Sequence, residues 1–512
     1  LAPTRFLGNS ILTASIVLGI MILPIIITLS EDAIRSVPRG LKEGSYAVGA
    51  TKLQTIKKII LPQSKSGIIT SMILATGRAI GETMAVLMIM GVNTQIPRSL
   101  FDVGGTMTSV IANSFLYSTS YPRTSHAIFA IALILFIMVF ILILIINIMQ
   151  RDRKLKRKQL FPSSIKQTIL STLKINKNRK KEERKDEQKF KILDSTQKKR
   201  FAIIENLTEE SRFYRNRNFS LFKDNQIPKN KSFYYKEKIT QSLIIFSAIF
   251  VTIFLFYIIG DILIRGGLSI KLEYFFLPEI RGGLEGGFAN AVVGSLQLTI
   301  FALAFAAPLS IAAAIYIQEY TKKDNIITKI ILFASDTLAS TPSIVFGAFG
   351  FAFFVRYLKF GWSLFAGGMT LGIMIIPLVL RSAIEGIKAI PDSYKEGSLA
   401  LGATKWQTIR SVVLPPATPT IISGIIISMG RAMGETAAII FTAGYASRIA
   451  TSIFSLTASM PNMIYNYYDL YLKYPVLKEK IFSAGAVLII VILILNSISR
   501  IISHHYGKMM KE

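Results

Sequence analysis

The sequence predicts an all-α polytopic membrane protein with about nine transmembrane helices. Its mean hydropathy is +0.48, and 51% of its residues are apolar while 17% are charged, which is typical of a chain that lies mostly in lipid. Nine apolar stretches are long enough, or nearly so, to cross a hydrocarbon core, which takes about 20 helical residues. In addition, one loop and the apolar helix after it occur twice in the chain.

The nine apolar stretches form a group of three and a group of six. They lie approximately at residues 6–29, 67–90, 128–148, 239–264, 290–317, 330–355, 363–380, 421–444 and 482–503. The segment between the third and the fourth is rich in Lys, Arg, Asn, Glu and Gln and has too few apolar residues for a core, which predicts a mostly disordered linker. The predicted regions are therefore a three-helix part at 1–150, the linker at 151–238 and a six-helix part at 239–512.

The linker supplies much of the basic charge of the chain. It holds 27 Lys or Arg against 11 Asp or Glu, in a chain whose formal net charge is +29. Such a run could bind nucleic acid by displacing counterions from phosphates. We favour the other interpretation, in which cationic segments beside transmembrane helices stay in the cytoplasm against anionic membrane lipid, and we expect no nucleic-acid partner.

The orientation of the chain follows from the same rule. With the linker in the cytoplasm, counting spans in both directions places the loops at 31–66 and 381–420 and the C-terminal tail in the cytoplasm as well. These segments are rich in Lys and Arg, as the positive-inside rule requires. Both copies of the repeated loop therefore face the compartment that contains ATP.

The repeat extends over about sixty residues. Residues 24–83 align with residues 377–436 without a gap. Each copy contains a loop with a Glu, a Gly six residues later and then a Leu-Pro pair, and the following apolar helix has an internal Arg and Glu. A duplication in register over this length, flanked by membrane spans, predicts two homologous transport half-units in one polypeptide.

The loop resembles the coupling loop of ABC importer permeases, whose pattern is Glu, five residues, Gly, nine residues and then Ile-x-Leu-Pro. The matching positions are Glu43, Gly49, Ala50, Leu61, Pro62, Glu396, Gly402, Ala403, Leu414 and Pro415, with Val412 in place of Ile in the second copy. The resemblance implies the type I importer permease fold, in which each loop forms a short helix that docks on a cytoplasmic ABC ATPase subunit. The chain has no Walker sequence, so we expect a transporter subunit whose ATP is hydrolysed by a separate protein.

A finer resemblance is to the phosphate-specific transport system. Residues 81–86, 91–93, 99–101 and 109–113 are similar to its C-type permease subunit, and residues 342–347 and 434–437 to its A-type subunit. The resemblance implies the C-terminal part of a C-type subunit fused to a whole A-type subunit. It also implies inward passage of phosphate between the two half-units, an external phosphate-binding protein as partner and a location in the bacterial inner membrane. The C-type part has three spans and starts at Leu1, which predicts a truncated sequence or a loss of the first spans.

Two Arg and Glu pairs lie inside apolar spans. In each pair the Glu follows the Arg by four residues, so we expect both side chains on one helix face. A charge at the centre of a span costs about 2.5–3.5 kcal/mol on insertion scales, which favours a place beside a pathway. The alternative is a self-neutralising structural pair, although such a pair contributes only a few tenths of a kcal/mol on an exposed helix. The phosphate resemblance adds a role in translocation, and the predicted pathway residues are Arg78, Glu82, Thr83, Arg431, Glu435 and Thr436.

A helix break is predicted within the sixth apolar stretch. Pro342 stands among Ser340, Thr341 and Ser343, a few residues after Asp336. A discontinuous helix here would expose polar groups to a cavity, while a kink satisfied by neighbouring helices is the alternative. The hydroxyls could bind an anion or could bond back to carbonyls of their own helices.

Three hypotheses for function remain open from the sequence. The first is a phosphate importer permease, and the second is a permease for another oxyanion such as sulfate or molybdate. The third is a membrane anchor whose basic linker recruits a partner. The chain has no cysteine and three histidines, so no metal site and no cofactor are expected.

Overall fold

A computed structural model describes residues 9–93, 95–118, 122–159, 231–321, 325–471 and 473–509. These residues are mostly helical, and the strands found among them are a single two-stranded hairpin. Within these described ranges, seven helices are long and apolar enough to cross a membrane, and two bent helix pairs raise the number to nine if each pair is one span. The predicted all-α polytopic class is confirmed.

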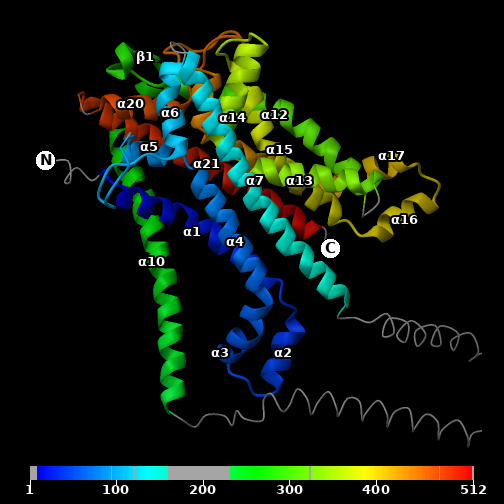
Figure 1. The fold of residues 1–512 in the computed structure, drawn as a ribbon. Helices are drawn as coiled ribbons and strands as arrows, with labels where there is room; N and C mark the ends of the chain where they lie inside the picture. Colours follow the sequence, from blue (N-terminus) through cyan, green and yellow to red (C-terminus); the bar gives the residue numbers. More distant parts are fainter. Residues whose placement is uncertain are drawn as a thin grey trace, which may run out of the picture. The chain divides into compact units, whose positions relative to one another are not determined.

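The helices before the linker are coloured blue to cyan in Figure 1. They are α1 (Ile11–Arg35), α2 (Arg39–Ala47), α3 (Lys52–Thr55), η2 (Ile56–Ile60), α4 (Leu61–Gly81), α5 (Met84–Met90), α6 (Met107–Ser118) and α7 (Pro122–Gln159). The predicted stretch at 67–90 is a bent pair, because α4 and α5 meet at an angle of 59°.

The linker lies mainly at residues 160–230, outside the described residues. Its described ends are helical, since 151–159 belong to α7 and 231–238 to the next helix. The following elements are α10 (Lys231–Ser269), α11 (Glu273–Phe276), β1 (Glu279–Ile280), η3 (Arg281–Gly283), β2 (Glu285–Gly286), α12 (Ala289–Ile315), η4 (Tyr316–Tyr320), α13 (Ile326–Ser340), α14 (Ser343–Gly350) and η5 (Phe351–Tyr357).

The second copy of the repeat and the C-terminal helices complete the chain. They are α15 (Leu364–Lys388), α16 (Asp392–Ala400), α17 (Lys405–Thr408), η6 (Ile409–Val413), α18 (Leu414–Met433), α19 (Ala437–Thr442), α20 (Met460–Leu470) and α21 (Val476–Met509). The chain divides into two compact units, one of residues 1–33, 67–146 and 252–512, the other of residues 34–66 and 147–251.

The repeat in the sequence is also a repeat in local structure. α16, α17, η6 and α18 begin 353 residues after α2, α3, η2 and α4, respectively. Thr51 and Thr404 each start the short third helix of their loop with a capping box, in which side chain and backbone exchange hydrogen bonds with a Gln three residues later. Gly49 and Gly402 turn the chain at φ of 81° and 85°, a region that favours glycine.

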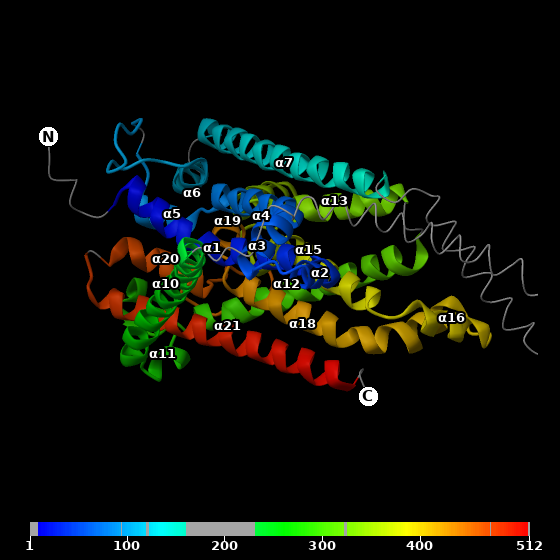
Figure 2. The ribbon, with the colours of Figure 1, turned by 90° about the horizontal axis from the view of Figure 1, so that it is seen from below.

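The helices of the larger unit pack around α15. α15 contacts α12 and α18, and α18 contacts α21, which runs beside it in Figure 2. Small residues allow these close approaches, because a Cβ at Gly424 would lie 2.2 Å from the Cβ of Ser382. The packed bundle fixes the ends of α13, α14, α18 and α19, where the candidate site lies.

A hairpin of β1 and β2 is tied to the start of α21 by a buried lysine. Lys480 is 2% exposed, and its ammonium donates to the carbonyl oxygens of Gly283 at 2.5 Å and Gly286 at 2.9 Å. The same ammonium lies 5.6 Å from the ring centroid of Tyr274. Backbone carbonyls and an aromatic face therefore replace the water that this cation loses on burial.

Candidate functional site

Both predicted Arg and Glu pairs lie where a helix stops inside a span. α4 carries Arg78 and ends at Gly81, so Glu82 falls in the break before α5. In the second copy α18 carries Arg431 and ends before Glu435, which falls in the break before α19. The expectation that each pair shares one helix face is wrong, because the glutamates are not helical.

The local hydrogen bonding explains these breaks. The N–H of Glu82 donates to the carbonyl of Ala79 at 3.2 Å, and the N–H of Glu435 donates to that of Ala432 at 3.3 Å. Both bonds span three residues, the tighter turn with which helices often end. The carboxylate of Glu82 then interacts with the backbone N–H of Ala85 in the first turn of α5, where a helix favours negative charge.

A third break meets the other two. α13 and the helix formed by α14 and η5 meet at an angle of 102°, with Pro342 at the junction, as predicted. A Cβ at Gly81 would lie 3.0 Å from the side chain of Pro342, so the first and third breaks are in contact. Ser343 is a hydrogen-bond partner of the Glu435 carboxylate, which brings the second break to the same place.

The four charges of the two pairs form one cluster. Arg431 interacts electrostatically with Glu435 and with Arg78, and Glu435 interacts in turn with Glu82 and Arg78. Arg78 is exposed, while the other three are half-buried. We call these four residues the charge quartet. Among the ion pairs at 4 Å or less that the described residues form, none joins Arg78 to Glu82 or Arg431 to Glu435. Direct ion pairing therefore does not neutralise the quartet.

The hydroxyls near the breaks divide into two groups. Ser340 and Thr341 donate to carbonyls of their own helix at 3.0 and 2.8 Å, and Thr83 donates to the carbonyl two residues before it at 3.3 Å. These three hydroxyls satisfy helix ends, as the second interpretation predicted. Thr108 of α6, which was not predicted from the sequence, donates to the backbone carbonyl of Glu82 at 2.8 Å.

Asp336 lies apart from the quartet. Its carboxylate accepts a hydrogen bond from Arg381 at 2.8 Å, and the Arg381 side chain is exposed while that of Asp336 is half-buried. It is not among the charges that act on Arg431 or Glu435.

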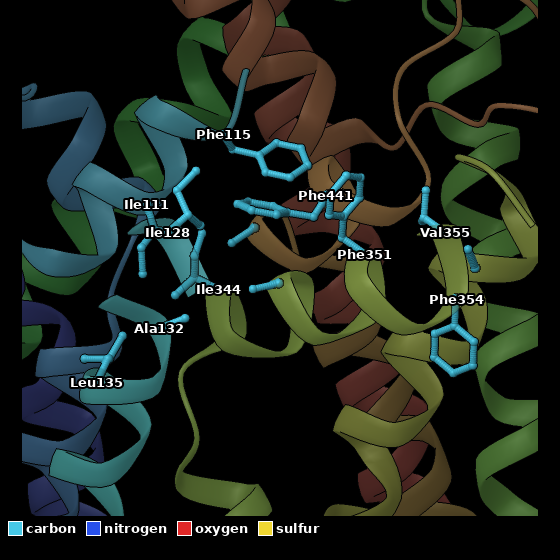
Figure 3. Close-up of a cluster of buried hydrophobic side chains, with 13 residues drawn as sticks. Ile111, Phe115, Ile128, Ala132, Leu135, Ile344, Phe351, Phe354, Val355 and Phe441 are labelled. Carbon is cyan, nitrogen blue, oxygen red and sulfur yellow. The ribbon is translucent and has the colours of Figure 1, made fainter. Parts of the chain in front are cut away.

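Figure 3 shows a cluster of buried apolar side chains, some of which come from the helices that begin at the breaks. Phe115 from α6 points toward Phe441 and Phe351, with ring centroids 3.8 and 4.8 Å apart. The same cluster contains Ile344, which follows Ser343, and Ala437, which follows Thr436. We call the group that contains Phe115, Phe351, Phe441, Ile344 and Ala437 the aromatic plug. It joins α6, which follows the first repeat, to α14 and η5, which precede the second repeat, and to α19, which follows it.

The two repeated loops present their predicted coupling residues at the surface. Of the ten predicted positions seven are exposed, and the half-buried ones are Ala50, Ala403 and Leu414. The second loop also exposes large apolar side chains, with Leu401 at 91%, Tyr394 at 64% and Trp406 at 55%. Large apolar side chains exposed on a loop are available for contact with another protein.

A known protein family matches more than half of the chain. The family described as "Binding-protein-dependent transport system inner membrane component" matches residues 4–155 and 306–511. The chain belongs to this family. It is therefore a multi-pass inner membrane permease component of an ABC transporter, and not a catalytic enzyme.

Relatives of this permease include proteins named for phosphate transport. The "Phosphate transport system permease protein PstA homolog" of Mycoplasma pneumoniae is 28% identical over 449 residues, which are 86% of this chain and 66% of the relative. "Phosphate transport system permease protein PstA 1" of Mycobacterium tuberculosis is 34% identical over 216 residues, 41% of this chain and 70% of the relative. The alignments thus cover about two thirds of each relative.

A solved structure also resembles this permease. A bacterial alginate ABC transporter, in complex with an alginate pentasaccharide-bound periplasmic protein, has a chain that is 18% identical. The match covers 54% of this permease and 98% of that chain with a TM-score of 0.40.

Proposed function

We propose that this permease is the transmembrane component of an ATP-driven phosphate importer, in which phosphate passes inward between the two repeats. The observation that carries the proposal is the charge quartet, which joins an Arg and a Glu from each repeat at three helix breaks. Similarity to the PstA relatives supports phosphate as the cargo.

The quartet has the chemistry that a phosphate passage needs. A guanidinium offers a planar fork of donors that matches phosphate oxygens, so Arg78 and Arg431 are the proposed cation pair. Glu82 and Glu435 balance their charge, which limits how tightly an anion is held and permits its release. Helix breaks expose backbone groups to a polar passage, and Thr83 and Thr436 stand at two of them.

We also propose the partners and the orientation. The exposed residues of the two loops, at 31–66 and 381–420, would dock on cytoplasmic ABC ATPase subunits, and an external phosphate-binding protein would deliver the cargo. The linker and the C-terminus would then be cytoplasmic, with the basic charge against lipid. Residues 1–150 would correspond to a C-type part and residues 239–512 to an A-type part.

The test is ATP-dependent phosphate uptake by vesicles that contain this permease, its ATPase and its binding protein. Arg78→Ala and Arg431→Ala are expected to lower uptake about tenfold or more, since each removes charge-assisted hydrogen bonds worth about 1.5–3 kcal/mol. Arg281→Ala is the matched control, because Arg281 is also followed by a Glu four residues later, with which it forms an ion pair, but it stands on the exposed hairpin. Copurification with the ATPase verifies assembly of each variant.

The competitors and the linker separate the other hypotheses. Uptake that is blocked by excess sulfate or molybdate would indicate a permease for another oxyanion. If both Arg variants transport normally while deletion of residues 151–238 abolishes activity, the anchor hypothesis replaces the transport hypothesis.

A further inference from the structure

The second repeated loop is joined to a helix far away in the sequence by a largely buried ion pair. Lys395 of α16 lies 2.5 Å from a carboxylate oxygen of Glu319, with side chains that are 17% and 10% exposed. Glu319 belongs to η4, the π-helical continuation of α12. A pair withdrawn from water to this degree is sensitive to the loss of either partner, because the remaining charge stays poorly solvated.

A second contact holds the other arm of the same loop. The ammonium of Lys405, at the start of α17, lies 4.8 Å from the ring centroid of Tyr320, the neighbour of Glu319. The two lysines stand on opposite sides of the turn at Gly402. η4 therefore contacts both α16 and α17, so the second loop is attached to it at two points.

The far end of α12 contacts the segment that follows the broken span. Asn290, near its start, donates to the carbonyl of Ala446 at 2.8 Å, and Gln297 donates to that of Ala450 at 3.1 Å. This segment comes directly after α19, which begins beside Glu435 of the quartet. α12 thus runs from the loop at one end to the segment that follows α19 at the other.

We propose that the Lys395–Glu319 ion pair transmits movement of the second loop to α12. We call this ion pair the joint. The proposal rests on the proposed function, because it requires an ATPase that displaces the loop. When the ATPase closes, α16 and η4 move as one body, and α12 carries the displacement to the segment at 446–450. Lys395 and Glu319 are positioning residues, and neither contacts the cargo.

The first test measures whether α16 and η4 are one rigid body. The chain has no cysteine, so Ser393→Cys on α16 and Tyr316→Cys on η4 place two spin labels specifically. In the assembled transporter, the distance between the labels is expected to be the same without nucleotide and in the vanadate-trapped ATP state. Adding Glu319→Gln is expected to make that distance change between the two states. This readout requires no phosphate, so it separates this proposal from the identity of the cargo.

The second test measures how much phosphate is moved for each ATP hydrolysed. Glu319→Gln and Lys395→Gln are expected to lower this ratio about threefold or more while the ATPase still copurifies, and the charge swap Glu319→Lys with Lys395→Glu is expected to restore it. Lys388→Gln, the same change at an exposed lysine at the end of α15, is the control. A label distance that changes on trapping in the unaltered joint would overturn the proposal, as would single variants that match the control.

Discussion

At the scale of single residues, Glu279 attaches the β1–β2 hairpin to other parts of the protein. It is 5% exposed, and the hydroxyl of Tyr445 donates to its carboxylate. Its backbone N–H donates to the side chain of Asn290 at 3.2 Å, and the charge of Lys480 acts on it as well. β1 is therefore fastened to elements that follow it by more than 150 residues.

Burial raises the pKa of Glu279 above its ordinary value, although hydrogen bonds from Tyr445 and Asn290 oppose the rise. A carboxyl whose pKa is higher in the folded state favours the protonated form there. Its contribution to stability is full below the ordinary glutamate pKa and is lost as the pH rises through the raised value. The hairpin should thus be held more firmly in mild acid than at neutral pH.

Hydrogen exchange of the hairpin amides, corrected for the intrinsic rate, measures this effect. Protection in the wild type is expected to rise as the pH falls from 7 toward 5. Glu279→Gln imitates the protonated carboxyl and is expected to remove that dependence. Glu285→Gln, at the exposed side of the same hairpin, should keep the wild-type profile. Protection that declines in the wild type on acidification would contradict the assignment.

At the scale of elements, the turn of each repeated loop depends on a glycine. Gly402 has a φ of 85°, and a Cβ placed there would meet nothing within 4 Å. The cost of a side chain at this position is therefore a backbone cost, which is about 1–2 kcal/mol for the left-handed region. Gly49 has the same conformation in the first loop.

Gly402→Ala is expected to destabilise the second loop by about 1–2 kcal/mol, seen as faster hydrogen exchange in α16 and α17. Gly397→Ala gives the opposite expectation, because Gly397 lies inside α16 with open space around it, and Ala favours a helix by about 0.5–1 kcal/mol. If the two variants change hydrogen exchange equally, the positive φ at residue 402 does not determine the stability of the loop.

The elements also show what the sequence can predict. Hydropathy predicted nine spans, and the described residues contain seven helices long enough to span a membrane and two bent helix pairs. Pro342 marked a break because proline cannot donate a helical hydrogen bond. The breaks at Glu82 and Glu435 were not predicted, because an acid and a threonine after a glycine are compatible with a continuous helix. The joint between Lys395 and Glu319 was not predicted either, since local spacing does not indicate which carboxylate a lysine meets 76 residues away.

At the scale of the whole molecule, the two repeats meet in the quartet, and the segments that adjoin them meet in the aromatic plug. Phe115 follows the first repeat in the chain, and its ring packs on Phe441, which follows the second. Tyr468 of α20 adds a hydrogen bond to the carbonyl of Met88 in α5 at 2.6 Å. A charged quartet beside an apolar plug is an arrangement that can hold an anion and also block it, because a hydrated ion does not enter an apolar region without a large desolvation cost.

If the plug closes the passage, shortening it should let phosphate pass without ATP. Phe441→Ala removes a side chain that is 1% exposed, and such a change in a packed core costs about 3–5 kcal/mol, so the folded yield must be followed by size-exclusion chromatography. Phe441→Leu keeps most of the side-chain volume, so it shortens the plug with a smaller loss of folding stability. Both variants are expected to raise phosphate efflux from loaded vesicles in the absence of ATP, Ala more than Leu. Phe349→Ala, at a side chain that is 48% exposed on α14, should leave efflux at the wild-type level. Folded Phe441 variants that remain tight to phosphate would place the closure of the passage elsewhere in the molecule.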